Sequence, residues 1–212
     1  SIEPTTIDDR IFSRLIDTNS KVCRYAHIPV QSGCDATLKR MRRKYSMASY
    51  RHQIEKIMQW NPDVCIGTDV IVGFPGESEA EFMETYSNLE QLPLAYFHVF
   101  PYSERQMAHS RKFENPVAQP VIQARAKRLR ILSAQKKAAY CKRYVGQSMG
   151  VLIEQKKEYG WLGHTDNFIS VCVPVHSTVA RNTLVSCQLT HYDSETGLMH
   201  GVIDSSQPDG PA

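Results

Sequence analysis

An almost unbroken apolar run, VCIGTDVIVG at residues 64–73, limits the folds that are open to this chain. Such runs are typical of strands that are covered on both faces, as in parallel sheets. The run ends in the turn FPGE, and S-E-A-E at 78–81 forms a capping box, the reciprocal pair of side-chain bonds that starts a helix. We therefore expect a strand, a tight turn and a helix in direct succession.

The same alternation extends on both sides of this unit. VCRYAHIPV at 22–30 and LAYFHVF at 94–100 read as further strands, and helices are expected at 5–19, at 35–43 and behind Ser46. Strands that alternate with helices indicate right-handed βαβ units and a parallel sheet, which is an α/β fold. The pattern ends soon after LAYFHVF, whereas a closed (β/α)8 barrel takes about 250 residues. Either the sheet is open, or the chain is the back portion of a barrel.

The second half of the chain has a different pattern of residues. A long basic helix is expected from about 120 to 144, and five short strand candidates follow behind Gly146: MGVLIEQ, YGWLGHT, FISVCVPV, LVSCQLTHY and LMHGVI. Five closely spaced strands indicate a small antiparallel barrel or an OB-like module. We thus expect one domain at 1–144, a second at 145–207 and a tail at 208–212.

Basic residues are concentrated in two places, although the net charge is only +3. KRMRRK at 39–44 holds five basic residues in six, and residues 125–143 hold eight basic residues and no acidic one. Helix faces exposed to water usually mix both signs. The two runs therefore favour a polyanionic partner such as a nucleic acid.

Other kinds of protein are disfavoured. No stretch approaches the roughly 20 apolar residues of a membrane span, and the start has no signal peptide, so no membrane partner is expected. The six cysteines are dispersed and no two are spaced as C-x-x-C, so neither a metal site nor a disulfide framework is predicted. Dispersed cysteines suit a reducing compartment, and we expect a cytoplasmic protein.

Four blocks, HIPVQSG, DVIVGFPGE, HVFPYSER and LGHTDNFISV, occur in this order along the chain. Together they resemble the C-terminal half of the radical-SAM methylthiotransferases, and the last block is similar to the RNA-binding TRAM domain of that family. HVFPYSER most resembles the branch that modifies threonylcarbamoyl-adenosine in tRNA. The resemblance implies that residues 1–144 are the back part of a radical-SAM TIM-like barrel and that 145–207 are a TRAM domain.

The resemblance also implies an activity. Such an enzyme methylthiolates C2 of N6-threonylcarbamoyladenosine at position 37 of tRNA, using S-adenosylmethionine (SAM) and two 4Fe–4S clusters, each held by three cysteines. This sequence has neither set of cysteines, so we expect an inactive fragment of a transferase, monomeric, with the anticodon stem-loop of tRNA as its partner. A branch that acts on isopentenyl-adenosine tRNA or on a ribosomal protein remains an alternative. So do a non-enzymatic RNA-binding adaptor and an open-sheet enzyme unrelated to radical chemistry.

The turn behind the apolar strand is the expected cofactor site. Parallel strands leave main-chain groups free at their carboxyl ends, and the glycines of the turn allow a ligand to approach closely. Asp69 lies in an apolar strand, so it is either a structural partner inside the barrel or a polar contact near the site. Glu77 falls one residue late for the pattern G-x-I-x-G-x-x-E of many radical-SAM proteins, and no adenine contact is assigned to it. The resemblance predicts SAM contacts at Glu3, Gln31, Ser32, Asp69, Gly73 and Gly76.

Residues expected to contact the substrate lie in the first basic run and behind the last strand of the sheet. One of Arg40, Arg42 and Arg43 can clamp a carboxylate through two parallel hydrogen bonds, and Arg43 is the first choice. The residues behind the last strand would read the base or its side chain: Tyr102, Ser103 and Arg105. His27 and His98 lie inside strands and are expected to be core residues.

The basic helix and the small barrel are the expected RNA-binding parts. Aromatic rings can stack on unpaired bases, but Trp161 and Phe168 are expected in the core of so small a barrel. Lysine and arginine side chains contact phosphates. The candidates are Arg125, Lys127, Arg128, Arg130, Lys156, Lys157, His164, Thr165, Asn167 and Arg181. No catalytic residue and no metal ligand is assigned within this chain.

Overall fold

The computed structural model describes residues 2–7, 10, 13–14, 17, 21–104, 113, 115–175, 177 and 179–204. The chain forms two compact units, Ser1–Lys136 and Lys137–Ala212, so the division falls inside the long helix. Most of the helix expected at 5–19, together with Arg105 and the tail at 208–212, lies outside the described residues. None of the described helices has the length and hydrophobicity that a bilayer crossing requires.

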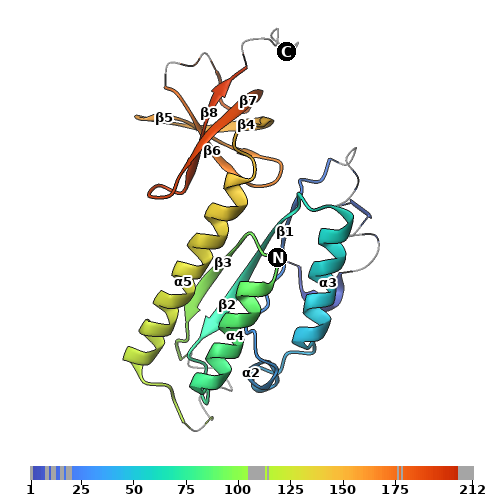
Figure 1. The fold of residues 1–212 in the computed structure, drawn as a ribbon, viewed down its shortest axis with the longest axis vertical. Helices are drawn as coiled ribbons and strands as arrows, with labels where there is room; N and C mark the ends of the chain where they lie inside the picture. Colours follow the sequence, from blue (N-terminus) through green and yellow to red (C-terminus); the bar gives the residue numbers. More distant parts are fainter. Residues whose placement is uncertain are drawn as a thin grey trace. The chain divides into compact units, whose positions relative to one another are not determined.

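The first unit alternates strands and helices, as the sequence predicts (Figure 1). Its three strands form one parallel sheet in the order β1-β2-β3, which confirms the α/β class. A short 3-10 turn, η1, precedes them and contains the buried Pro4. The elements are η1 (Pro4–Thr6), β1 (Tyr25–His27), α2 (Asp35–Arg40), α3 (Met47–Trp60), β2 (Cys65–Val72), α4 (Glu79–Gln91), β3 (Tyr96–Pro101) and α5 (Gln119–Lys142), the last of which continues into the second unit.

The strand register places the carboxyl ends of the three parallel strands together, at one end of the sheet (the carboxyl edge). Tyr25 of β1 is the partner of Cys65 in β2, and β2 pairs with β3 from Gly67↔Tyr96 to Val72↔Pro101. Among the described strands β2 is central, and β1, within the strand expected at 22–30, lies at one side of the sheet. The carboxyl ends of parallel strands are where such sheets bind ligands.

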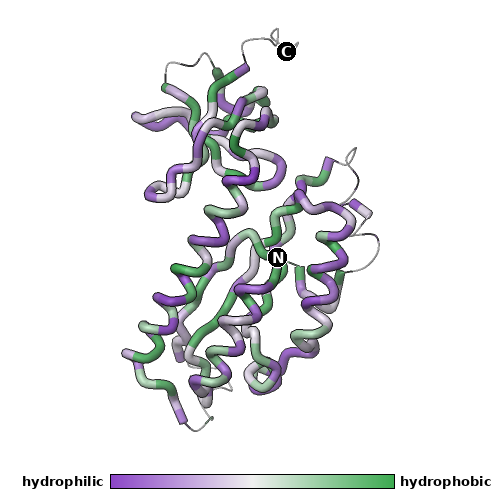
Figure 2. Tube along the Cα trace, in the orientation of Figure 1, coloured by the Kyte–Doolittle hydropathy of each residue, from purple (hydrophilic) through white to green (hydrophobic). Residues whose placement is uncertain are grey.

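One face of the sheet carries the hydrophobic core. Figure 2 shows green, hydrophobic stretches along β2, whereas the helices mix green with purple. Side chains of α3, α4 and α5 pack with the strands in one cluster, represented by Ile54, Phe82, Leu129, Val70 and Phe97. Several alternate residues of the strands, including His27, Asp69 and His98, are half-buried or exposed, although Cys65 and Gly67 of β2 are buried. The sheet therefore has one covered face and one open face within the described part of the unit.

Helices α3 and α4 begin behind the capping serines that the sequence predicts. Ser46 caps α3 by accepting from the Ser49 amide, and Ser78 caps α4 by accepting from the Glu81 amide. In the second case Glu81 reaches back to the Ser78 amide, which completes the predicted capping box. These caps fix where α4 begins and hence the length of the turn in front of it.

The second unit is a closed five-stranded barrel in the order β4-β5-β6-β8-β7. Its strands are β4 (Ser148–Lys157), β5 (Gly160–Thr165), β6 (Ser170–Val173), β7 (Leu184–Asp193) and β8 (Leu198–Ile203). This confirms the small barrel that the sequence predicts, in which β6 and β8 run parallel and the other paired strands are antiparallel. Five strands cannot alternate in direction all the way around a closed ring, so one parallel pair is unavoidable. The interior is filled by side chains such as Val151, Ile153, Val171, Leu189 and Met199.

Candidate functional site

The turn that follows β2 depends on two glycines. Gly73 (φ +80°) and Gly76 (φ +78°) lie in the left-handed region, which is unfavourable for residues with a side chain. A Cβ atom on Gly73 would lie 2.4 Å from Cγ1 of Ile122 in α5. Gly73 therefore permits the close packing of α5 against the turn, in addition to the turn conformation itself.

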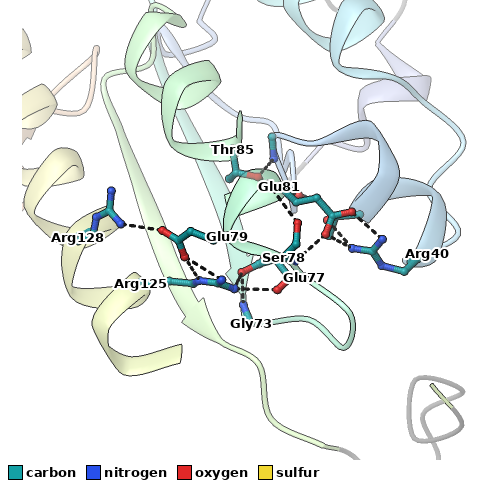
Figure 3. A network of polar contacts seen from close by, with 12 residues as sticks. Arg40, Gly73, Glu77, Ser78, Glu79, Glu81, Thr85, Arg125 and Arg128 are labelled. Atoms are coloured by element: carbon teal, nitrogen blue, oxygen red, sulfur yellow. Dashed lines mark hydrogen bonds and ion pairs between the residues drawn. The ribbon is translucent and has the colours of Figure 1, made fainter. Parts of the chain in front are cut away.

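Glu77 closes the same turn from its other end (Figure 3). Its Oε1 accepts one hydrogen bond from the Gly73 amide (3.1 Å) and another from Nη1 of Arg125 (2.7 Å). The Glu77 side chain is only 2% exposed. Burial raises the pKa of Glu77, and the bonds from Gly73 and Arg125 oppose this rise. The carboxylate thus supports the turn from inside the unit.

Arg125 belongs to the basic helix, yet its guanidinium points into the unit. Its side chain is 6% exposed, and Nη2 lies 2.9 Å from Oε2 of Glu79. To reach a phosphate, this guanidinium would have to leave Glu77 and Glu79, and the RNA contact of Arg125 stays a prediction. Arg128 pairs with Glu79 (3.3 Å) and is partly exposed, whereas Lys127 and Arg130 are exposed on the same helix.

The arginines of the first basic run have different partners. Arg40 makes a bidentate contact with Glu81, with Nη1–Oε1 at 2.8 Å and Nη2–Oε2 at 2.7 Å, and this contact lowers the pKa of Glu81. Arg43 lies at the carboxyl edge of the sheet, where its Nη1 is 3.5 Å from Oε1 of Glu3. The fold thus brings together a predicted SAM contact, Glu3, and a predicted substrate contact, Arg43.

The two polar residues behind β1 differ in what they offer. Ser32 is buried, its Oγ lies 3.3 Å from Oγ1 of Thr85, and it accepts from the Cys34 amide (3.3 Å). To contact SAM, the Ser32 hydroxyl would have to give up these partners, and its SAM contact stays a prediction. Gln31 has a φ of +64°, and its main chain bonds to Asp69 and Ile71 of β2, while its side chain stays half-buried at the edge.

Two cavities lie beside the turn. One of about 230 Å³ is lined by Arg40, Met41, Arg42, Arg43, Ile71, Phe74 and Phe113. The other, of about 310 Å³, is lined by Gly73, Pro75, Tyr102, Glu104, Phe113, Pro116, Val117, Gln119 and Ile122. The rings of Phe74 and Tyr102 meet edge-on at 5.4 Å. Predicted SAM and substrate residues therefore line neighbouring hollows, and Ser103 is exposed directly behind Tyr102.

The open face of the sheet carries a polar cluster, of which only Asp69 is a predicted site residue. Asp69 has a structural partner on the neighbouring strand, since its Oδ1 lies 3.1 Å from Nε2 of His27. The hydroxyls of Tyr25 and Tyr96 lie 2.8 Å apart. His98 is exposed, so its expected place in the core is wrong. The repeated Y-x-H spacing of 25–27 and 96–98 is the sequence signal for this shared face.

Gly67 makes the tyrosine contact possible. A Cβ atom on Gly67 would lie 2.8 Å from Cζ and from Oη of Tyr96. Because Gly67 has no side chain, the ring of Tyr96 crosses the central strand and reaches the hydroxyl of Tyr25 on the far strand. The cluster thus spans all three strands of the sheet.

In the barrel, the predicted RNA contacts fall into two groups. Lys156, Lys157 and Arg181 are exposed, and Nζ of Lys156 lies 5.1 Å above the ring of Trp161. Thr165 and Asn167 are buried and bond to each other (Oγ1 to Oδ1, 2.6 Å), and their RNA contacts stay a prediction.

The aromatic residues of this hairpin also differ from expectation. Trp161 is half-buried, which places it between the barrel interior and the surface. Phe168 is 44% exposed, so its expected place in the core is wrong. His164, a predicted RNA contact, is held between Oε2 of Glu154 (2.7 Å) and Oγ of Ser170 (3.0 Å). The surface of the hairpin is therefore aromatic as well as polar.

The described residues do not suit an iron–sulfur cluster. No three His, Cys, Asp or Glu side chains of the described part come together as metal ligands. Cys34, Cys65, Cys141, Cys172 and Cys187 are buried. Burial raises the pKa of Cys141 and of Cys187 to about 11, which disfavours the thiolate that a cluster requires.

Comparison with known proteins gives the class first. Residues 1–89 match the model of the Radical SAM superfamily. The chain is 37% identical over 176 residues to the threonylcarbamoyladenosine tRNA methylthiotransferase of Bacillus subtilis (strain 168), covering 81% of this chain and 39% of that protein. The tRNA-2-methylthio-N(6)-dimethylallyladenosine synthase of Thermus thermophilus is 36% identical over 175 residues, covering 81% and 37%. The ribosomal protein uS12 methylthiotransferase of Alkaliphilus oremlandii (strain OhILAs) is 33% identical over 196 residues, covering 89% and 44%.

The chain is therefore a relative of the radical-SAM methylthiotransferases, a family of transferases, as the four sequence blocks predict. It spans less than half the length of each of these three relatives. The identities of 37% and 36% to the two tRNA enzymes are too close to separate their substrates.

Proposed function

We propose that this chain is part of a tRNA methylthiotransferase that acts on N6-threonylcarbamoyladenosine at position 37, beside the anticodon. The identities of 37% and 36% to two tRNA methylthiotransferases, each over 81% of this chain, support the reaction and the tRNA substrate. The observation that carries the choice of the threonylcarbamoyl branch is the block HVFPYSER at 98–105. In this proposal the protein is a cytoplasmic monomer that binds the anticodon stem-loop.

SAM and two 4Fe–4S clusters belong to this proposal, and when bound they supply the radical, the sulfur and the methyl group. The donor set at the carboxyl edge suits the amino-acid end of SAM. Glu3 offers a carboxylate to its ammonium group, and this carboxylate lies 3.5 Å from the guanidinium of Arg43. Gln31 adds a side-chain amide at the same edge. The described residues provide no comparable donors for a cluster, so this chain alone is expected to be inactive.

The substrate base is expected beside the turn. Phe74 and Tyr102 offer aromatic surface to an adenine, and the hydroxyls of Tyr102 and Ser103 can hydrogen-bond to its substituent. The threonyl carboxylate would bind Arg42 or Arg43, which line the cavity of about 230 Å³. Gly73 and Gly76 keep the turn close to these residues.

RNA contact is assigned to exposed cations of both units. The barrel, taken as a TRAM domain at 145–207, offers Lys156, Lys157 and Arg181, and helix α5 offers Lys127 and Arg130. Each neutralises a phosphate without reading sequence. Recognition of the modified base is then left to the first unit.

Binding of anticodon stem-loops tests this function. We would measure the Kd of the 212-residue chain for loops with threonylcarbamoyl-adenosine, isopentenyl-adenosine or plain adenosine, over a salt series. Salt-sensitive binding that prefers the threonylcarbamoyl loop is the expected result. A preference for the isopentenyl loop would reassign the branch. No binding to any loop would contradict an RNA-binding role for this part of the protein.

A further inference from the structure

The hairpin between β5 and β6 places an aromatic residue where the backbone favours a different residue type. The Phe168 amide bonds to the Thr165 carbonyl (3.0 Å), and the Thr165 amide bonds to the Ile169 carbonyl (3.1 Å). This is a three-residue loop, 166–168, whose last position is left-handed, with a φ of +64° at Phe168. Glycine or asparagine is usual at such a position, and a bulky residue is an outlier.

Burial does not explain the choice of phenylalanine. The barrel interior is filled by other residues, and Phe168 is 44% exposed. The residue therefore carries the cost of an unfavourable backbone conformation without the gain of core burial. Strain that a fold retains in this way points to a use at the surface.

Phe168 and His164 together form a flat aromatic surface. Their rings are stacked, with centroids 5.2 Å apart and an angle of 18° between the planes. Both nitrogens of the His164 ring have partners, Glu154 at 2.7 Å and Ser170 at 3.0 Å, so the imidazole is fixed from two sides. A fixed ring under an exposed one limits the rotation of Phe168, which lowers the entropy cost of stacking a ligand on it.

Apolar and cationic residues lie next to this pair in the strand register. Leu152 of β4 is the cross-strand partner of His164, and Leu184 of β7 is the partner of Leu152. Both leucines are exposed, at 42% and 74%. The exposed Arg181 precedes Leu184 by three residues, and its neighbour Asn182 bonds through its amide to the Ile153 carbonyl (2.7 Å) beside Leu152. An aromatic platform with apolar surface and a cation beside it suits a base and its phosphate.

We infer that Phe168, stacked on His164, is a binding site for one unpaired nucleobase of RNA. The inference rests on the proposed function, since it assigns a base contact to a barrel proposed to bind RNA. The site takes any base, because every base has a π face, and adds no sequence preference of its own.

The test replaces Phe168 by residues that suit the left-handed position but cannot stack. Phe168→Asn and Phe168→Gly remove the ring and relieve the backbone, so the thermal midpoint should stay or rise. Phe168→Tyr keeps the ring. Tyr159→Asn is the matched control, because Tyr159 is a 63% exposed aromatic residue in another turn of the same barrel.

The probe is a single-stranded RNA oligonucleotide that contains 2-aminopurine, whose fluorescence falls on stacking. For the full chain, Phe168→Asn should raise the Kd roughly 5- to 150-fold and abolish the quenching, as expected for the loss of one stacked base. The salt dependence should keep its slope, since no charge is removed. Phe168→Tyr and Tyr159→Asn should bind and quench like the unchanged chain.

The alternative outcomes are distinct. If the unchanged chain binds and Phe168→Asn binds equally well, the stacking site is wrong and the proposed function stands. If Phe168→Asn instead turns an oligomer into a monomer and leaves RNA binding unchanged, the pair is a protein contact and the inference fails. If the unchanged chain binds no RNA, the inference falls together with the RNA-binding role.

Discussion

Nη1 of Arg125 lies 2.7 Å from Oε1 of Glu77, and both side chains are almost completely buried. The same Glu77 oxygen accepts from the Gly73 amide, so one carboxylate joins the turn behind β2 to helix α5. A buried ion pair adds little net stability compared with apolar residues of similar size, but removal of one partner leaves the other charge without compensation.

We therefore predict that Arg125→Met lowers the free energy of unfolding by about 3–5 kcal/mol. Arg130→Met, on the exposed side of the same helix, should change it by less than about 0.5 kcal/mol. Urea unfolding followed by circular dichroism measures both. Adding Glu77→Gln to Arg125→Met should recover part of the loss, and a double variant as unstable as the sum of its single changes would contradict the pair.

The exposed cations of α5 should act through salt-dependent RNA binding. Lys127→Gln and Arg130→Gln should each lower the slope of log Kd against log salt concentration by about 0.7–0.9, because each cation releases counterions from one phosphate. Ile131→Gln, at an exposed position of the same helix, should leave the slope unchanged. Unaltered slopes in both charge variants would remove α5 from the RNA-binding surface.

Glu81 should make stability depend on pH. Its pKa is lowered in the folded state, chiefly by hydrogen bonds from Arg40, so the contact stabilises the fold above the ordinary glutamate pKa of about 4.3. That contribution should begin to fade as the pH falls below this value, and it should vanish once the pH is below the lowered pKa of the folded state.

Glu81→Gln should cost about 1–3 kcal/mol at neutral pH and flatten the acid limb of the stability profile. Glu55→Gln serves as the control, because Glu55 makes only a longer, more exposed contact with Arg51 (3.8 Å). Thermal unfolding from acidic to neutral pH separates the two. An equally steep acid limb in the Glu81 variant would show that another carboxylate is responsible.

Gly67→Ala should disturb the open face of the sheet. The new methyl group would overlap the Tyr96 ring, displace it and break the 2.8 Å contact with Tyr25, at a cost of about 1–3 kcal/mol. Combining it with Tyr96→Ala should remove the overlap, so the double variant should be no less stable than Tyr96→Ala alone. We would measure the coupling free energy between positions 67 and 96 by chemical denaturation of the unchanged chain, both single variants and the double variant. Additive effects would contradict the overlap.

Most elements of the fold follow from local patterns in the sequence. The apolar run at 64–73, the capping boxes at Ser46 and Ser78 and the alternating strands of the barrel each act over a few residues, which is why they are readable without the structure. The parallel pair β6–β8 is set by closure of the ring and has no local signature.

The directions of two side chains show what sequence alone lacks. Arg125 stands in a run without acidic residues, but its partner Glu77 is 48 positions away and only the fold brings them together. Phe168 looks like a core residue by type, and only the left-handed backbone places its ring at the surface. Charge and hydrophobicity thus identify candidate site residues better than they predict the direction in which each side chain points.

The bond from the Gly73 amide to the Glu77 carboxylate also restricts how this loop can change in evolution. An insertion or a deletion between these two residues would move the carboxylate away from both the amide and Arg125. The buried guanidinium of Arg125 would then lose its buried partner. The segment should therefore tolerate replacement of Phe74 or Pro75 more readily than a change in length. Among natural variants, the number of residues between the strand and the capping serine should be kept even where their identities differ.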